Sequence, residues 1–163
     1  MAILPILFFD NPVLRQKAKR VPVIDDSIQR LIDDMIETMR AAPAGGLAAP
    51  QVGVPLRVIV VVLPGEEPFA LINPEVVRKS GEREVMEACL CLPRYAGEIK
   101  RSAKVTVKGL DRRGREVRIR GEELMAQALE HEIDHLNGIL YIDHLESMEK
   151  LFKVEAGAEP PEI

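Results

Sequence analysis

The sequence has no tryptophan, only two cysteines and only three histidines among its 163 residues. Cys89 and Cys91 lie two positions apart, a spacing that disfavours a disulfide and suits a reducing compartment, where neighbouring thiols bind metals or react. The longest apolar run, Val58 to Leu63, is far shorter than the roughly 20 residues that a membrane-spanning helix needs. We therefore expect a chain without disulfides or membrane spans, located in the cytoplasm.

Basic residues are not in excess. Lys and Arg total 22 and Asp and Glu total 26, which leaves a formal net charge of −4. A nucleic-acid binder is expected to carry a basic face, and the acidic C-terminal end offers no basic helix for ribosomal RNA, so we predict neither a nucleic-acid partner nor a membrane partner. The apolar N-terminal stretch has no preceding Lys or Arg and is interrupted by Pro5, so we expect no signal peptide.

Apolar residues make up 47% of the chain and charged residues 29%, which is typical of a folded globular protein. The length predicts a single domain over residues 1–163. Short strands around two helices, with little room for crossover connections, predict a compact α+β fold.

The pattern of apolar residues, glycines and prolines assigns the elements of this fold. The expected helices are residues 25–42 and 121–138, and the expected strands are residues 57–63, 69–72, 75–78, 104–110, 116–120 and 139–142. Residues 44–53 are expected to form a loop rich in glycine and alanine, residues 1–24 an irregular arm, and residues 155–163 a frayed acidic tail.

The strongest motif lies in the second predicted helix, where residues 131–135 read His-Glu-Ile-Asp-His. Residues four apart lie on one face of a helix, so His131 and His135 are placed to bind the same cation. Glu132 follows the first histidine and is positioned to carry protons beside that cation. The competing interpretation is a pair of exposed helix histidines next to a solvated glutamate.

A catalytic metal site of this kind needs a third protein ligand and an open fourth position. The candidates are His144, Cys89, Cys91 and a carboxylate. His144 is better explained as an ordinary surface or core histidine, and the longer metalloprotease pattern would place its third histidine where this chain has Tyr141. A cysteine is therefore favoured, and the spacing does not choose between the two.

Leu124 and Ala128 share the helix face of the two histidines, which directs that face toward the core or a cleft and leaves space beside the metal at Ala128. Plain core packing explains these two residues equally well. Histidine ligands usually donate their second N–H to a carboxylate or carbonyl, and Glu87 and Asp134 are the candidates. For Asp134, solvation or a pair with Arg101 is at least as good an explanation.

Three segments, in this order, resemble the peptide deformylase family. They read Gly46-Leu47-Ala48-Ala49-Pro50-Gln51, then Glu87-Ala88-Cys89-Leu90-Cys91, then His131-Glu132-Ile133-Asp134-His135-Leu136-Asn137-Gly138. The resemblance spans nearly the whole chain, and the ordered set is far more specific than any one motif. It implies a compact α+β domain with antiparallel sheets around the metal-bearing helix.

The resemblance implies a hydrolase that removes the formyl group from the N-terminal formyl-methionine of new polypeptides and releases formate. Its metal ligands would be Cys89, His131 and His135, holding one divalent ion, with Fe²⁺ the usual native ion and Zn²⁺ a common occupant. Glu132 would be the general base, and Gln51 and the backbone N–H of Leu90 would bind the formyl oxygen.

The resemblance also implies where the substrate lies. The backbone near Gly46 and Ala88 would meet an extended nascent peptide, and Leu124 and Ala128 would contribute to a pocket for the methionine side chain. Transient proximity to the ribosome would follow from such a substrate.

The chain departs from the family pattern at four positions. Ala44 and Ala88 stand where glycine is usual, Cys91 where serine is usual, and Glu130 where glutamine is usual. None of these changes removes a ligand, the base or Gln51. A general metallopeptidase, a peptide-binding protein without turnover and a hydrolase with a cysteine nucleophile are the alternative functions.

Overall fold

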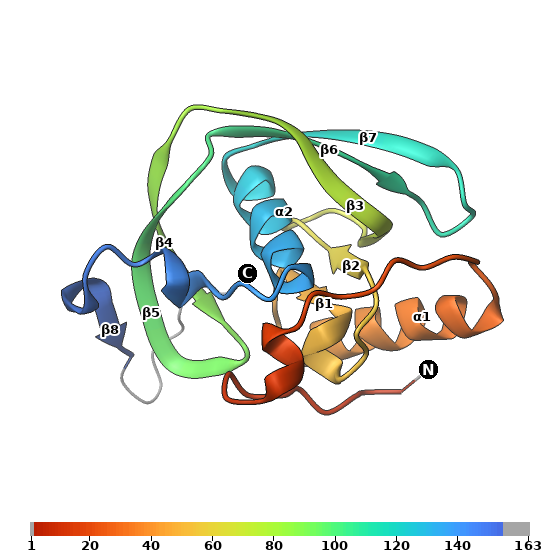
Figure 1. The fold of residues 1–163 in the computed structure, drawn as a ribbon, viewed down its shortest axis with the longest axis horizontal. Coiled ribbons are helices and arrows are strands. Elements are labelled where there is room, and N and C mark those ends of the chain that lie inside the picture. Colours follow the sequence, from red (N-terminus) through yellow and green to blue (C-terminus); the bar gives the residue numbers. More distant parts are fainter. Residues whose placement is uncertain (1, 155–163) are drawn as a thin grey trace.

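The structure, a computed structural model, describes residues 2–154, and it has the predicted α+β architecture (Figure 1). The tail predicted over residues 155–163 lies outside this range. The helices and strands are α1 (Asp26–Ala41), β1 (Gly46–Ala48), β2 (Val58–Val61), β3 (Phe69–Ser80), β4 (Arg83–Cys89), β5 (Leu92–Arg101), β6 (Lys104–Leu110), β7 (Glu116–Glu122), α2 (Glu123–Leu136) and β8 (Leu151–Lys153). None of the described helices has the length and apolar character needed to cross a membrane.

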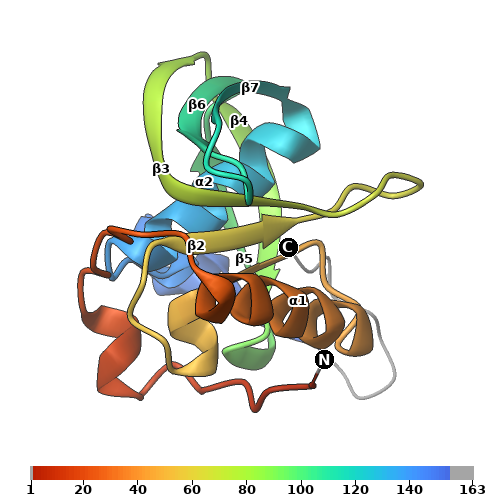
Figure 2. The same ribbon diagram turned by 90° about the vertical axis from the view of Figure 1, so that its right-hand side faces the viewer.

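A five-stranded antiparallel sheet, in the order β1-β2-β3-β6-β7, lies between the two helices (Figure 2). Successive side chains of a strand point to opposite faces of the sheet. Ile59 and Val61 pack with residues of α2, whereas Val58 and Val60 pack with residues of α1. Because both faces of β2 are covered, this strand is apolar at every position.

Helix α1 is the element that the sequence pattern predicted most closely. It begins after Asp25, whose side chain caps it by accepting a hydrogen bond from the backbone N–H of Ile28 at 3.2 Å. It ends just before Pro43, as expected from the steric restriction that proline places on the preceding residue. The apolar stripe is buried against the sheet: Ile28, Ile32, Met35 and Met39.

A second antiparallel sheet, in the order β4-β5-β8, closes the other side of the molecule. Strands β4 and β5 form a hairpin whose last register pair is Cys89 with Leu92, so the chain reverses over Leu90 and Cys91. Helix α2 contacts strands of both sheets and lies at the centre of the fold (Figure 1). The predicted arrangement of antiparallel sheets around this helix is therefore confirmed.

Helix α2 is buried along most of its length. It begins two residues later than predicted, because Gly121 still belongs to β7 and pairs with Val105. Its end at Asn137 and Gly138 is as predicted, with Gly138 in the left-handed conformation at φ 74°.

The prediction of two short strands over residues 69–72 and 75–78 was wrong, because β3 continues through Asn73 and Pro74. The register with β6 shifts between Ile72 and Glu75, so these residues form an irregularity within one strand. Asn73 has φ 53°, and its side chain accepts from the N–H of Val21 and donates to the carbonyl of Val21. These bonds to the N-terminal arm hold the bulge.

Three other segments also differ from the predictions. The expected loop over residues 44–53 contains β1, which forms because Leu47 pairs with Val60 of β2. A 3-10 helix, Ala49–Val52, follows β1 directly. Strands β4 and β5 were not predicted, because their sequences have no clear strand pattern. They are stabilised by pairing with each other. Residues 139–142 do not form a strand; a 3-10 helix, Tyr141–His144, occupies this region.

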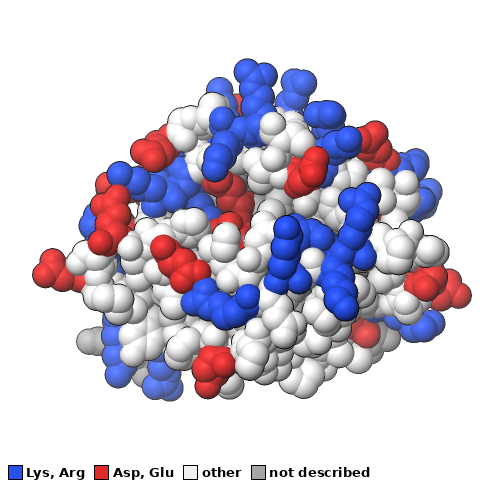
Figure 3. Space-filling model, viewed as in Figure 1, with Lys and Arg blue, Asp and Glu red and all other residues white. Residues whose placement is uncertain are grey.

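Charge is distributed unevenly over the surface, although the formal net charge is −4. Lys and Arg side chains gather over β3, β6 and β7, along the upper edge of the molecule in Figure 3. Lys104 pairs with Glu122 at 3.6 Å and Lys108 with Glu116 at 2.9 Å, so part of this charge is compensated. The total charge did not predict this basic area.

We expect Gly138→Ala to lower the free energy of unfolding by about 3 kcal/mol or more. A left-handed non-glycine residue costs about 1–2 kcal/mol, and a Cβ at Gly138 would lie 2.6 Å from the carbonyl oxygen of Arg15, which forces a backbone shift. Gly65→Ala is the matched control, because Gly65 has φ 79° but, apart from its chain neighbours, no atom of residues 2–154 lies within 4 Å of its Cβ position. Urea denaturation of both variants tests this, and equal losses would show that the contact with Arg15 is unimportant.

Candidate metal centre

Cys89, His131 and His135 come together in the interior of the protein. One ligand-type atom of each residue lies within 4.8 Å of the others, and all three side chains are buried. Cys89 ends strand β4, and the two histidines lie one turn apart on α2. Within the described residues, the group of mutually close ligand atoms contains Cys89 and not Cys91, and it consists of the three residues that the resemblance implied.

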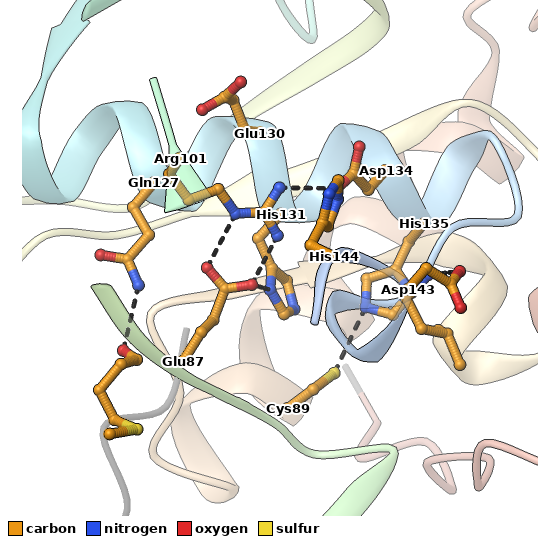
Figure 4. Close-up of polar contacts among 12 residues, drawn as sticks. Glu87, Cys89, Arg101, Gln127, Glu130, His131, Asp134, His135, Asp143 and His144 are labelled. Atoms are coloured by element: carbon orange, nitrogen blue, oxygen red, sulfur yellow. Dashed lines mark hydrogen bonds and ion pairs between the residues drawn. The ribbon is translucent and has the colours of Figure 1, made fainter. Parts of the chain in front are cut away.

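Hydrogen bonds fix the direction of the ligand atoms. Glu87 contacts Nδ1 of His131 at 2.6 Å, which leaves Nε2 of this ring directed to the centre (Figure 4). Nε2 of His135 lies 3.3 Å from the Cys89 sulfur. A carboxylate on the second nitrogen of a histidine ligand sets its tautomer and ring orientation. Glu87 therefore takes the role for which it was a candidate.

Glu87 is itself held by a buried arginine. The Nε and Nη2 groups of Arg101 donate to the two carboxylate oxygens of Glu87 at 3.0 and 2.5 Å, a bidentate pair. Arg101 also donates to Asp134 at 2.7 Å, and Asp134 contacts Nε2 of His144 at 2.8 Å. Asp134 thus pairs with Arg101, as the alternative interpretation held, and His144 lies outside the ligand cluster.

The charged partners of Glu87 and His131 decide the protonation of these two buried groups. Desolvation alone would raise the pKa of Glu87, but the charges and hydrogen bonds of His131 and Arg101 outweigh it and lower the pKa to about 2. Desolvation alone would lower the pKa of His131, but the nearby Glu87, Glu132 and Cys89 raise it above its ordinary value. Glu87 therefore remains a carboxylate through the physiological range.

The thiol of Cys89 holds its proton in the absence of a cation. Its hydrogen bond with Cys91 and its burial raise the pKa to about 12, although the charges of His135 and His131 oppose this. Only the thiolate binds a metal, and a coordinating thiol is deprotonated outright by the ion. Binding of a cation would therefore release a proton from Cys89.

Glu132 lies beside the cluster and is fully buried. Burial raises the pKa of its carboxyl to about 8, with the charge of His131 opposing this. A Cβ at Gly46 would lie 2.5 Å from Oε2 of Glu132, so the backbone of β1 approaches this carboxyl as closely as only glycine permits. Gly46 and Glu132, which the resemblance placed in one site, are thus in contact.

The donor atoms fit a divalent cation. Of the seven buried side-chain N and O atoms without a hydrogen-bond partner in the described residues, three belong to this centre: Nε2 of His131 and both carboxylate oxygens of Glu132. Buried polar atoms almost always have a partner. One thiolate and two imidazoles form a set that binds transition metals such as Zn²⁺ and Fe²⁺.

Gln51 is oriented toward the same centre. Its Oε1 accepts from the backbone N–H of Ala48 at 2.9 Å, and its Nε2 donates to the sulfur of Cys89 at 3.4 Å. The first bond fixes which end of the amide faces the cluster, so the amide N–H₂ group is a donor at the site. Leu90 follows Cys89 directly, in the turn of the β4–β5 hairpin.

A cavity of about 420 Å³ lies beside Gly45, the residue before β1. Its walls include Leu124, Ala128, Ala44, Gly45, Val62 and Leu63. Ala128 is buried, whereas Leu124 is 41% exposed and lies at the rim, so the two residues do not share one buried environment. Leu124 and Ala128 both line this largely apolar cavity. Ala44, which stands where the family pattern usually has glycine, lines it as well.

The other departures from the family pattern have separate positions. Ala88 is buried in β4 directly before Cys89. Glu130 accepts hydrogen bonds from the N–H and the hydroxyl of Ser102 and points away from the ligands (Figure 4), so its charge is satisfied there. The sulfur of Cys91 lies 3.2 Å from that of Cys89.

Two residues near the site were not assigned a role from the sequence. Arg101, on β5, was considered only as a partner of Asp134, and no local pattern signals that it also holds Glu87. Tyr141 is buried, and its hydroxyl has no partner in the described residues. Desolvation first, and then the nearby Cys89, Cys91 and Glu87, raise the pKa of Tyr141 above its ordinary value.

Comparison with known proteins finds relatives that match nearly the whole chain. The family model for polypeptide deformylase matches residues 3–151. A peptide deformylase of Dehalococcoides mccartyi (strain CBDB1) is 57% identical, with 99% of this chain and 98% of that protein covered. Among solved structures, a peptide deformylase from Legionella pneumophila has a TM-score of 0.88 at 45% identity, covering 91% of this chain and 89% of that one.

A structure of a peptide deformylase from Synechococcus elongatus in complex with actinonin has a TM-score of 0.87 at 38% identity, covering 90% of this chain and 81% of that one. The named relatives place the chain in a class of metal-dependent hydrolases, and its Cys-His-His cluster could hold the metal ion. More specifically, the chain belongs to the polypeptide deformylase family.

We expect the Glu87 carboxylate to contribute stability that is present above pH 4.5, its ordinary pKa, and lost as the pH falls toward about 2. The pKa is depressed in the folded state, so acid protonates the unfolded chain first and favours it. Relative to Glu87→Gln, the metal-free protein should lose about 2 kcal/mol of unfolding free energy between about pH 6 and pH 3. Parallel urea titrations of the two proteins measure this difference. A constant difference over that range would contradict the assignment of the depressed pKa to Glu87.

Proposed function

We propose that this chain removes the formyl group from the N-terminal formyl-methionine of newly made polypeptides and releases formate. The observation that carries the proposal is the buried Cys89–His131–His135 cluster in a chain of the deformylase family. Beside the cluster lies the carboxyl of Glu132, which has no hydrogen-bond partner among the described residues. The reaction is hydrolysis of a linear formamide. Residues 1–163 would form one catalytic domain.

We propose Cys89, His131 and His135 as the ligands of one divalent ion. Fe²⁺ is proposed as the native ion because of the family resemblance, and Zn²⁺ as an alternative occupant because it generally binds such donors more tightly than Fe²⁺. When bound, the ion polarises the scissile carbonyl and lowers the pKa of water from about 15.7 toward about 7. The Cys89 thiolate adds negative charge that a third imidazole would not.

Glu132 is proposed as the general base and acid. Its carboxyl has no hydrogen-bond partner in the described residues, so both oxygens are available to the reacting groups. It would take a proton from the attacking water and return this proton to the leaving amine of the methionine. Burial raises the pKa of Glu132 to about 8 in the absence of a cation. A bound cation would lower this pKa and favour the carboxylate, which is the form that accepts the proton.

The amide of Gln51 and the backbone N–H of Leu90 are proposed to stabilise the oxyanion that develops on the formyl oxygen. The Ala48 N–H holds the Gln51 amide with its N–H₂ group toward the centre before any substrate arrives. Removing one prepositioned donor of this kind typically costs about 3–4 kcal/mol of transition-state stabilisation.

Selectivity for formyl follows from size. The carbonyl carbon of a formyl group bears only hydrogen, so a closed site admits it and excludes acetyl. The contact of Gly46 with Glu132 supports such a narrow centre. We propose that the backbone near Gly46 and Ala88 meets the extended peptide, and that the cavity walled by Leu124 and Ala128 receives the methionine side chain.

The natural substrates are proposed to be nascent N-formyl-methionyl peptides, encountered in transient proximity to the ribosome. Both cysteines are free thiols, which supports a reducing compartment, and we propose the cytoplasm.

Glu132→Gln should retain the bound metal and lose at least 10²-fold in turnover, because the variant keeps the shape of the side chain but cannot transfer the proton. Metal content and formate release from a formyl-Met peptide measure the two properties. The same peptide carrying an acetyl group or a free amine is the specificity control. Undiminished formate release would reject the base assignment, and activity on the free-amine peptide alone would favour a general peptidase.

Cys89→Ala should lower the metal affinity by orders of magnitude, since it removes one of three protein ligands. Cys91→Ser and His144→Ala are matched controls that leave the ligand set intact. Competition with a chromogenic chelator measures the affinities. Loss of metal in the Cys91 variant with retention in the Cys89 variant would exchange the proposed ligands.

A further inference from the structure

The two cysteines lie on a tight turn. Cys89 pairs with Leu92 across the β4–β5 hairpin, so only Leu90 and Cys91 form the connection. The two-residue spacing of the cysteines in the sequence disfavours a disulfide. The turn brings the two sulfurs to 3.2 Å of each other, both of them buried.

The two sulfurs are in direct contact but are not bonded. The sulfur atoms of a disulfide lie about 2.05 Å apart, so an approach of about 1.2 Å would join Cys89 and Cys91. Side-chain rotation with a small adjustment of the two-residue turn provides movement of this size. Both residues lie in the same packed cluster, with Leu14, Leu92 and Tyr141 among its members, and that environment keeps the pair together.

Packing alone does not require a thiol at position 91. A serine or alanine side chain is smaller than cysteine and would also fit at this position of the cluster. A role as a fourth metal ligand is not supported either, because within the described residues the group of mutually close ligand atoms consists of Cys89, His131 and His135. The short contact of the Cys91 sulfur is with the sulfur of Cys89.

We propose that Cys89 and Cys91 form a reversible oxidation site, in which Cys91 is the resolving thiol that converts oxidised Cys89 into an intramolecular disulfide. This inference rests on the proposed function in one respect, namely that Cys89 is a ligand of the catalytic metal. The oxidant is a peroxide, of which hydrogen peroxide is little larger than the water that the hydrolytic site must admit.

The chemistry has two steps. The sulfur of Cys89 attacks one peroxide oxygen, the O–O bond breaks, and Cys89 becomes a sulfenic acid while one water is released. The sulfur of Cys91 then attacks the sulfur of the sulfenic acid, the S–O bond breaks, and a second water leaves with the thiol proton. Together the two thiols lose two electrons and two protons, and the peroxide is reduced to two waters.

The disulfide removes a ligand from the metal centre. With Cys89 bonded to Cys91, only His131 and His135 remain to hold a cation, so the metal should be released. In the absence of Cys91, the sulfenic acid would progress to sulfinic and sulfonic acids, which thiol reductants do not reverse. Cys91 would thus protect Cys89 from irreversible oxidation, and the metal would be lost only until the disulfide is reduced.

The test uses the full-length chain loaded with zinc, which has no redox chemistry of its own. After treatment with hydrogen peroxide at low molar excess, a chromogenic chelator measures zinc release, and intact-mass spectrometry with peptide mapping locates the modification. We expect one equivalent of zinc to be released, both thiols to be lost and the chain to become lighter by two hydrogen atoms. A dithiol reductant with added zinc should restore the thiols and the bound metal.

Cys91→Ser is the matched control, because it replaces only the sulfur of the resolving thiol. Its Cys89 should gain two or three oxygen atoms, and reductant should not restore metal binding. Cys91→Ala provides a second variant should serine perturb the fold, and it should behave in the same way. Wild-type protein in which Cys89 becomes a sulfinic or sulfonic acid while Cys91 stays a free thiol would overturn the proposal, as would a disulfide between two chains. These readouts need no substrate, so a failure of formate release would count against the proposed function and not against the thiol pair.

Discussion

The position of one buried carboxylate governs the metal centre. Glu87 lies between the guanidinium of Arg101 and the imidazole of His131, with no exposure to solvent. Isolated buried charges cost several kcal/mol each, and such groups are tolerated where pairing and hydrogen bonds compensate them. Here the bidentate arginine pair holds the Glu87 carboxylate, and Glu87 in turn leaves only Nε2 of His131 free for a cation. Burying these charges lowers the stability of the fold, and in return the Nε2 atom of His131 is held in one direction.

The sequence predicted the centre better than its surroundings. The i, i+4 spacing of His131 and His135 identifies one helix face and therefore half of the site, whatever the rest of the fold. Glu132 is then placed by its neighbours along the chain. Cys89 could be reached only through the resemblance, since its distance from the histidines depends on how β4 packs against α2. Helix α1 was predicted almost to the residue, because its cap and its apolar stripe are local signals.

The remaining features depend on partners that are distant in sequence. Arg101 lies opposite Arg83 in the pairing of β5 with β4, and it gains its role because its side chain reaches Glu87 in the folded protein. Neither strand has a strong pattern of its own. Strand β1 is three residues long and exists because Leu47 pairs with Val60. Asn73 and Pro74 favour a break, but bonds of Asn73 to Val21 keep β3 continuous. Each difference arises where tertiary pairing overrides a local preference.

Both sheets contribute residues to the site. Cys89 comes from the end of β4 in the smaller sheet, whereas Gly46 comes from β1 in the larger one, and both approach the same turns of α2. The helix contributes His131, Glu132 and His135 and is covered from both sides, which buries the proposed ligands and raises the pKa of Glu132. Neither sheet alone would bury this helix face. A cation that joins the end of β4 to α2 therefore connects the two halves of the fold, so that metal binding and the packing of the smaller sheet are expected to stabilise each other.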